Sequence, residues 1–326
     1  MRLKMVPENT KLDFFGVSKL SVGLSSALII ASIVAFFTMG LNFGIDFRGG
    51  SMIMVETPEA VPVGEYRQIL GDLDIGDVSV TEISDPAAAL KGEVKNIVLV
   101  RIEQMDDDPA IQNDVIIRVK DTLRTAFPGV VFLQTDSVGA KVSGELVQAG
   151  ILAVVLAVAA VLFYIWLRFE WQFSVGAVAA LVHDIILTIG VFAVTQIEFN
   201  LTIIAAILTI VGYSLNDTVV VFDRVRENLR RYKQKDLKEV LNLSINETLS
   251  RTVMTSVTTL IALLALYFLG GDVIRGFTFA MIWGIVVGTY SSVFVASVIL
   301  LRLGVKRDWD KTDNGAAGTQ FANIDA

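Results

Sequence analysis

The sequence contains no cysteine, so it can form neither a disulfide framework nor a thiolate metal site. Histidine is nearly absent as well: His183 is the single example, which argues against a conventional zinc centre and hence against a membrane metalloprotease. Charged residues are scarce, at 19% of 326 residues, whereas an ordinary soluble domain carries about 25%. These three shortages favour a membrane protein, and we expect it to carry no cofactor.

Long apolar runs explain why charged residues are scarce in this sequence. Hydrophobic residues make up 53% of the chain, and the mean hydropathy is +0.62. A run of about twenty apolar residues is long enough to cross a hydrocarbon core about 30 Å thick. The first run exceeds the roughly 7–15 apolar residues of a signal peptide and no Ala-x-Ala-like site follows it, so it predicts a retained helix. Six transmembrane helices are predicted, at residues 20–40, 146–167, 173–195, 200–222, 253–270 and 277–301.

Basic residues are unevenly distributed among the segments that connect these runs. They cluster in the N-terminal tail, at Arg168, in segment 223–252 and after Arg302. Because Lys and Arg are retained on the cytoplasmic side, both termini and segment 223–252, interpreted as a loop, are predicted to be cytoplasmic. The expected organisation is a cytoplasmic tail (1–19), a first helix (20–40), a periplasmic domain (41–145), a five-helix transmembrane domain (146–303) and a cytoplasmic tail (304–326).

The insertion after the first helix has the composition and pattern of a small α+β domain. Residues 42–145 carry 18 acidic and 9 basic side chains, which argues against nucleic acid as a partner. Short runs rich in Val, Ile and Leu indicate strands, and stretches with helical spacing separate them. The order β-α-β-β-α-β, which is typical of a ferredoxin-like fold, is predicted from residues 51–55, 64–71, 78–83, 96–102, 108–127 and 130–134.

Two charged residues near the cytoplasmic ends of the fourth and fifth helices are candidates for proton coupling. Asp217, next to Asn216, lies inside the fourth helix, and Arg251 lies at the start of the fifth. Helices joined by one connection usually pack antiparallel, so the spacing predicts an Asp217–Arg251 pair. A charge in hydrocarbon is costly unless it is paired or hydrated. Three interpretations are open: a protonation switch, in which withdrawal of the arginine favours proton uptake; a static ion pair that locks the two helices; and an aspartate that simply reaches the membrane interface.

His183 and Asp184 lie near the middle of the third predicted helix. Adjacent residues on a helix point about 100° apart, so we expect the two side chains not to face each other as a dyad. At least one is expected to face the interior of the bundle. A proton relay and an interhelical hydrogen bond remain the two interpretations of this position.

Two motifs in this chain resemble those of a known family. The first is Asn42-Phe43-Gly44-Ile45-Asp46-Phe47-Arg48-Gly49-Gly50, directly after the first helix, and the second runs from Gly212 to Asn228 around Asn216-Asp217-Thr218. Both are similar to motifs of the SecF family, subunits of the SecDF protein-export complex in the RND transporter superfamily. His183-Asp184 and Arg251-Thr252-x-x-Thr255-Ser256 also match, and the resemblance covers nearly the whole chain in order.

This resemblance implies a fold, partners and a role. The six helices would form half of a twelve-helix RND-type bundle completed by SecD, in the bacterial inner membrane. The complex would associate with the SecYEG channel and use the proton gradient to assist export after the ATP-driven step, while its periplasmic domains engage the emerging polypeptide. The chain would then be a translocase subunit and not an enzyme.

The resemblance also assigns roles to individual residues. Asp217, Arg251, Asn216, His183 and Asp184 are the expected proton-coupling residues; because a principal proton-binding aspartate lies on SecD, Asp217 is left as either the main or a supporting carrier. Asp46, Arg48, Gly49 and Gly50 are expected at a hinge or at a simple turn between helix and strand. Two other functions remain open: an RND exporter of small molecules or lipids, and a non-transporting scaffold for periplasmic proteins.

Overall fold

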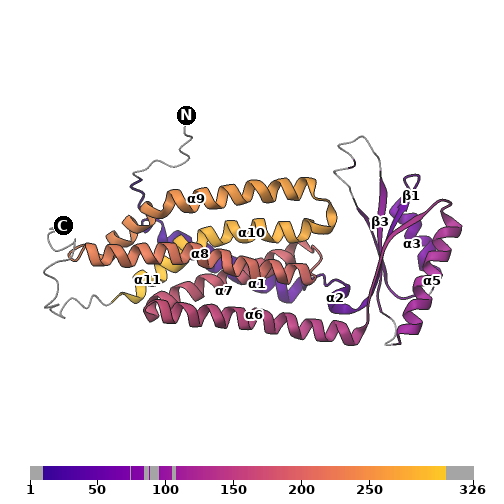
Figure 1. The fold of residues 1–326 in the computed structure, drawn as a ribbon, viewed down its shortest axis with the longest axis horizontal. Helices are drawn as coiled ribbons and strands as arrows, with labels where there is room; N and C mark the ends of the chain where they lie inside the picture. Colours follow the sequence, from indigo (N-terminus) through magenta and orange to yellow (C-terminus); the bar gives the residue numbers. More distant parts are fainter. Residues whose placement is uncertain (1–9, 74, 84–87, 89–94, 105–107, 306–326) are drawn as a thin grey trace.

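The computed structural model describes residues 10–73, 75–83, 88, 95–104 and 108–305 (Figure 1). Most of the expected C-terminal tail and the first nine residues of the expected N-terminal tail lie outside this part. Within it, six helical segments are long and apolar enough to cross a membrane, which confirms a multi-pass membrane protein. They are α1 (Ser18–Met39), α6 (Ala140–Arg168), α7 (Trp171–Thr195), α8 (Leu201–Arg231), α9 (Leu237–Leu269) and a composite sixth span made of η1 (Asp272–Ile274), α10 (Arg275–Ser291), η2 (Ser292–Ala296) and α11 (Ser297–Leu303).

The bundle has a buried centre and an exposed perimeter. Helices α7, α8 and α10 bury a large share of their residues, whereas α1, α6 and α9 bury few of theirs. Small residues bring the central helices together: a side chain at Gly190 of α7 would collide with Ser32 of α1, and one at Gly284 of α10 would collide with Ile210 of α8. The exposed faces of the perimeter helices are therefore available to lipid or to another subunit.

The basic segment 223–252 is not a loop, which corrects the expectation from the sequence. Helix α8 continues to Arg231, α9 begins at Leu237, and only residues 232–236 connect them. The density of charged residues in this segment is typical of a loop. Buried apolar residues nevertheless recur among the charges at helical spacing, as Val225 and Leu229 do on α8. The two helices therefore continue as a hairpin whose inner face belongs to a hydrophobic core of the bundle.

The segment before α1 is held along this hairpin by two carboxamides of α9. The Asn246 side chain accepts from Leu12 N at 3.0 Å and donates to Leu12 O at 2.9 Å. The Asn242 side chain accepts from Phe14 N at 3.0 Å and donates to Asp13 Oδ1 at 2.9 Å. This last hydrogen bond holds the pKa of Asp13 below its ordinary value. The start of α1 is thus fastened to α9.

The domain between α1 and α6 is a four-stranded sheet with two helices on one face. Its strands pair antiparallel in the order β2-β3-β1-β4, and the chain order is β-α-β-β-α-β, so the ferredoxin-like prediction is confirmed. Ile53 and Val55 point from the sheet into a core with Tyr66 and Leu123 of the helices. The elements are β1 (Gly50–Thr57), α3 (Val63–Gly71), β2 (Val78–Ile83), β3 (Asn96–Ile102), α5 (Pro109–Ala126) and β4 (Val131–Val138).

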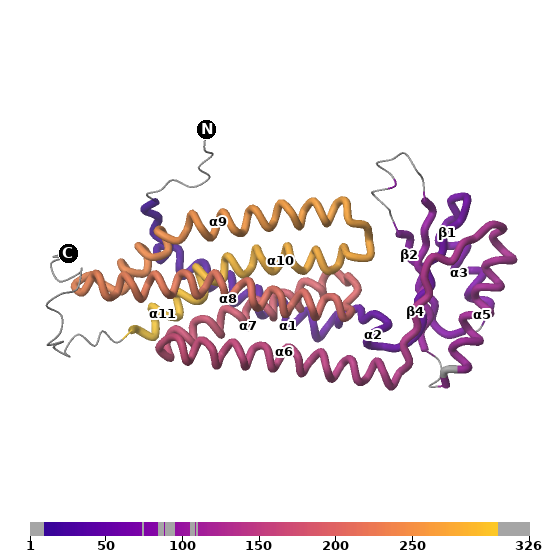
Figure 2. The backbone as a smooth tube through the Cα atoms, viewed as in Figure 1, coloured from indigo at the N-terminus to yellow at the C-terminus, as the bar shows by residue number. Residues whose placement is uncertain are grey.

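The sheet domain lies beyond one end of the helical bundle, and α11 lies at the opposite end (Figures 1 and 2). One connection runs from α1 through the short helix α2 (Ile45–Arg48) into β1. The other is Gly139 alone, because β4 ends at Val138 and α6 begins at Ala140. Helices α3 and α5 cover the far face of the sheet, so its second face is turned toward the bundle.

Candidate functional site

Asp217 is buried in α8 and contacts α9, as the antiparallel packing predicted. Only 4% of Asp217 is exposed, and its Oδ1 accepts a hydrogen bond of 3.5 Å from Thr252 Oγ1. Its Oδ2 is buried and has no hydrogen-bond partner within the described part of the chain. A carboxylate oxygen that is buried without a donor is energetically costly, because it has lost its water. The arrangement is therefore one that a proton or a moving donor would stabilise.

The expected pair between Asp217 and Arg251 is not formed in this structure. Among the described residues no hydrogen bond or ion pair joins them, and the Arg251 side chain is exposed. Thr252 occupies the position expected of Arg251, because one residue along a helix rotates the side chain by about 100°. Asn216 is also exposed, on a different face of α8 from Asp217.

Asp184 is the centre of a second buried site, where α7, α8 and α10 meet. Its Oδ2 accepts from Ser214 Oγ of α8 at 2.6 Å and from Ser291 Oγ of α10 at 2.8 Å. Its Oδ1 lies 2.9 Å from His183 Nδ1. None of the Asp184 side chain is exposed. One carboxyl group therefore links the three helices that form the buried centre of the bundle.

The contact between His183 and Asp184 corrects the expectation that they do not form a dyad. Their Cα–Cβ bonds diverge around the helix, but rotation about the side-chain bonds of two neighbouring residues is enough to bring the ring to the carboxyl group. Both side chains are buried, which confirms that the pair faces the interior. The other ring nitrogen, Nε2, is buried without a hydrogen-bond partner in the described chain.

An aromatic residue extends this site to α1. The His183 ring stacks on Tyr290 of α10, with centroids 6.1 Å apart. Tyr290 Oη donates to Ser21 O at 2.8 Å and lies 3.0 Å from Ser25 Oγ. Ser21 and Ser25 are among the few buried residues of α1. Hydrogen bonds from α1 to Tyr290 and one ring-stacking contact from Tyr290 to His183 therefore connect α1 through α10 to the Asp184 site.

Sequence reasoning did not identify Ser214, Ser291 or Tyr290 as parts of the site. Ser214 lies within the motif around Asp217, and Ser291 follows two small residues of the sixth span, Gly284 and Gly288. A serine on a transmembrane helix serves either helix packing or hydrogen bonding, and the sequence does not show which helix it faces. Within the described residues, no three His, Asp or Glu side chains are arranged to hold a metal ion.

The motif after α1 forms a joint between the sheet domain and the bundle. Asp46 Oδ2 accepts from Leu201 N at 2.9 Å, which caps the N-terminus of α8. Residue 43 forms a parallel bridge with Phe199, supported by a 2.7 Å bond from Phe199 N to Asn42 O. The joint therefore fixes the end of α1 to the start of the helix that carries Asp217.

Gly49 and Gly50 make the turn between α2 and β1, and both need the absence of a side chain. Their φ angles are +77° and +116°, which L residues with a side chain rarely adopt. A Cβ at Gly49 would also collide with Gln104, and one at Gly50 with the carbonyl oxygen of Ile102. Arg48 is the last residue of α2 and lines the hollow beneath the sheet.

Comparison with known proteins places these features in a family. A family model described as "Protein export membrane protein SecD/SecF, C-terminal" matches residues 118–306, and one described as "SecD/SecF GG Motif" matches residues 34–57. The protein translocase subunit SecF of Cereibacter sphaeroides is 55% identical over 325 residues, covering 100% of this chain and 99% of the relative. The SecF subunit of Ketogulonicigenium vulgare is 52% identical, covering 98% of each chain.

A solved structure agrees with these matches. The crystal structure of SecDF from Thermus thermophilus, described as a translocon-associated membrane protein, superposes with a TM-score of 0.79 at 33% identity over 93% of this chain. This chain spans 40% of the length of that SecDF chain. The match confirms the expected fold, a six-helix half of an RND-type bundle with a small sheet domain. The chain therefore belongs to the SecF family of protein translocase subunits.

Proposed function

We propose that this chain, together with a SecD subunit, forms a pump that uses the proton-motive force to assist protein export through the SecYEG channel after the ATP-driven step. The observation that carries this proposal is the buried carboxyl group of Asp217, which has one oxygen without a partner. A static ion pair would satisfy both of its oxygens, whereas a group that takes up and releases a proton needs access to more than one partner.

Two exposed polar residues support a partner subunit beside α8 and α9. Asn216 and Arg251 lie on the outer surface of the bundle, where contact with lipid would be costly. A second bundle with polar residues at the same depth would remove this cost. The solved SecDF chain, of which this chain spans 40%, supports SecD as that partner. Protons would then pass from the periplasm along the boundary between the two subunits.

The buried sites at Asp217 and Asp184, together with the joint at Asp46, would transmit a change in helix packing to the outer domain. Protonation near Asp217 would change the packing of α8 against α9, and the far end of α8 is capped by Asp46 of the joint. The energy is sufficient for a rigid-body movement, since each charge contributes about 2.3 kcal/mol per 100 mV and each pH unit about 1.4 kcal/mol. His183 and Asp184 would relay protons or transmit the movement, and Gly49 and Gly50 would act as the hinge.

The proposed orientation follows from the distribution of basic residues. The hairpin of α8 and α9 carries many of the arginines and lysines and lies at the end of the bundle away from the sheet. The positive-inside rule favours a cytoplasmic hairpin, cytoplasmic termini and a periplasmic sheet domain in the bacterial inner membrane.

The proposal is tested by Asp217→Asn and Arg251→Met in membrane vesicles with an imposed proton gradient. Both variants should lose the gradient-dependent part of export while a SecD subunit still co-purifies with them. Asp223→Asn is the matched control, because Asp223 is an exposed aspartate of the same helix, paired with Arg168 at 3.0 Å. Export at the wild-type rate by the Asp217 variant would rule out proton coupling at this site and favour a scaffold.

A further inference from the structure

The sheet presents an uncovered face to the bundle. Residues alternate along β1, so Ile53 and Val55 point into the core with α3 and α5, whereas Met52 and Met54 point the opposite way. In β3, Val100 faces the core and Leu99 the opposite side. No helix of the sheet domain covers this second face among the described residues. A sheet face that carries methionine and leucine and is not covered by helices of its own domain is suited to binding a partner.

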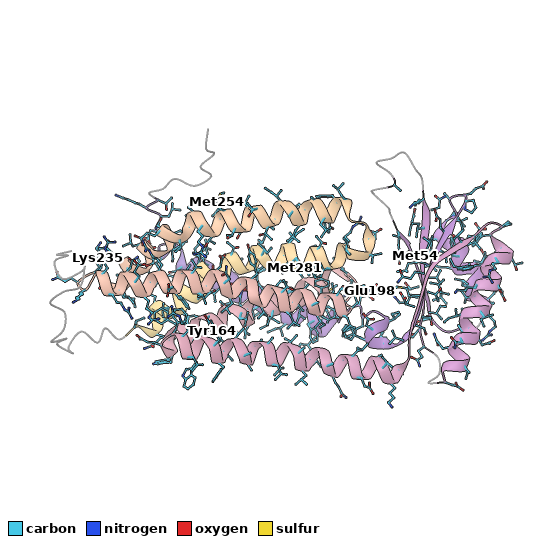
Figure 3. The ribbon with its side chains drawn as sticks, in the orientation of Figure 1. Met54, Tyr164, Glu198, Lys235, Met254 and Met281 are labelled. Carbon is cyan, nitrogen blue, oxygen red and sulfur yellow. The ribbon has the colours of Figure 1, made fainter. Side chains whose placement is uncertain are left out.

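Two adjoining hollows lie between this face and the end of the bundle. Their volumes are about 460 and 770 Å³, and they share four lining residues: Ile45, Thr81, Leu99 and Glu198. Figure 3 shows Met54 on the sheet and Glu198 at the facing end of the bundle. Each volume falls in the range of roughly 300–1,000 Å³ that is typical of ligand sites. Together the hollows form one cleft beneath the sheet.

The cleft has a strong excess of negative charge. Six carboxylates and three guanidinium groups line it: Asp46, Asp77, Glu103, Asp136, Glu198 and Asp272 against Arg48, Arg101 and Arg275. Glu198 is paired with Arg101, and Asp272 with Arg275. Asp136 lies opposite Met52 in the register and so shares the cleft face; it accepts from Gln134 Nε2, and within the described chain no cation pairs with it. This carboxylate is therefore available to a positively charged occupant.

The apolar part of the cleft is made of flexible or exposed side chains. Met52 and Met54 form its roof, and Val273, of which 70% is exposed, lies in its floor with Tyr267 and Phe277. Methionine has an unbranched, polarizable side chain that adapts to varied partners, and it is over-represented at surfaces that bind many sequences. The cleft therefore combines adaptable apolar contacts with negative charge.

We propose that this cleft binds an extended segment of the exported polypeptide, with a preference for segments that carry lysine or arginine among apolar residues. The proposal rests on the proposed export function and adds to it the place and the chemistry of the client contact. Neighbouring strands are about 4.8 Å apart, so four strands span about 14 Å, and an extended chain at about 3.3 Å per residue crosses them with four or five residues. A contact of four or five residues is short, which suits an exported polypeptide that must be released again as it moves.

The absence of native cysteine allows a direct test by disulfide cross-linking. Met54→Cys is combined, in SecDF-containing vesicles, with a stalled client that carries one cysteine beside a lysine-rich segment. Ile117→Cys is the matched control, since Ile117 is an exposed apolar residue of α5 on the far side of the sheet. The Met54 variant should give at least fivefold more cross-linked client than the control, and the mass of the product should increase with the length of the client.

Charge reversal tests the chemical preference. Asp136→Lys should reduce cross-linking of the lysine-rich client at least threefold and should increase it for a client with a glutamate-rich segment. The assignment is overturned if the cross-link at Met54 has a constant mass, which identifies a partner subunit as the occupant, or if it does not exceed the control. Gradient-dependent export is measured in parallel with the wild-type chain and the variants: its absence with the wild-type chain contradicts the proposed function, whereas its retention by the Met54 variant without a cross-link contradicts only the cleft.

Discussion

Replacing Asp184 tests whether its carboxyl group holds the centre of the bundle together. Asp184→Leu removes three hydrogen bonds, from Ser214, Ser291 and His183. Side-chain hydrogen bonds between transmembrane helices contribute about 0.6 kcal/mol on average and up to about 1.7 kcal/mol, so the loss should be roughly 2–5 kcal/mol. We expect the loss of stability to lie in the lower half of this range. Ser291 Oγ also donates to Gly288 O at 3.2 Å, and it keeps that hydrogen bond in the variant.

Asp184→Asn separates packing from proton chemistry. Its amide oxygen can accept from both serines, and its amide nitrogen can donate to His183 once the ring adopts its other tautomer. The purified Asn variant should therefore melt within about two degrees of the wild type, whereas the Leu variant should melt at least five degrees lower, measured by size-exclusion chromatography after heating. A Leu variant as stable as the wild type would refute the structural role. Gradient-dependent export by the stable Asn variant then reports whether the carboxyl group also transfers protons.

Three further changes test other parts of the structure. Asn246→Leu should release the segment around Leu12, which loses both of its backbone hydrogen bonds to the carboxamide, and amide exchange there should rise at least tenfold; unchanged exchange would contradict the contact. Gly50→Ala should lower the melting temperature by several degrees, because its φ is +116° and a Cβ would meet the β3 backbone. The hydrogen bond from Asn242 lowers the pKa of Asp13. The contact between Asp13 and Asn242 should therefore be complete above pH 3.8, the ordinary pKa of an aspartate, and should weaken as the pH falls through the lowered pKa. Pepsin cleavage beside Phe14 should rise only in that acidic range.

The strands of the outer domain were the most predictable part of the fold. Strands β2 and β3 run from Val78 to Ile83 and from Asn96 to Ile102, the bounds expected from the sequence. Both are short runs rich in Val, Ile and Leu, so the local pattern is sufficient. The prediction for segment 223–252 was wrong because its charges surround the buried apolar residues of two helices. Charge density alone does not distinguish such a helix from a loop.

The candidate site was predictable in its residues but not in its contacts. A carboxyl group within an apolar run is conspicuous, so Asp184 and Asp217 were found from the sequence alone. Which side chain meets Asp217 depends on helix rotation, and a shift of one residue exchanges Arg251 for Thr252. The partners of Asp184 on α8 and α10 come from segments far apart in the chain, and hydrophobic periodicity carries no information about their rotation.

The pairing of β1 with β4 sets the geometry of any swing of the outer domain. Gly50 lies opposite Val138 in the register, so the two connections to the membrane, Gly49-Gly50 and Gly139, leave the sheet side by side at one corner. If the proposed hinge at Gly49-Gly50 bends together with Gly139, the two points define an axis, and the domain would rotate about that line without stretching either strand. The sheet and its two helices would then turn as one rigid plate, and its opposite edge, at β2, would travel farthest.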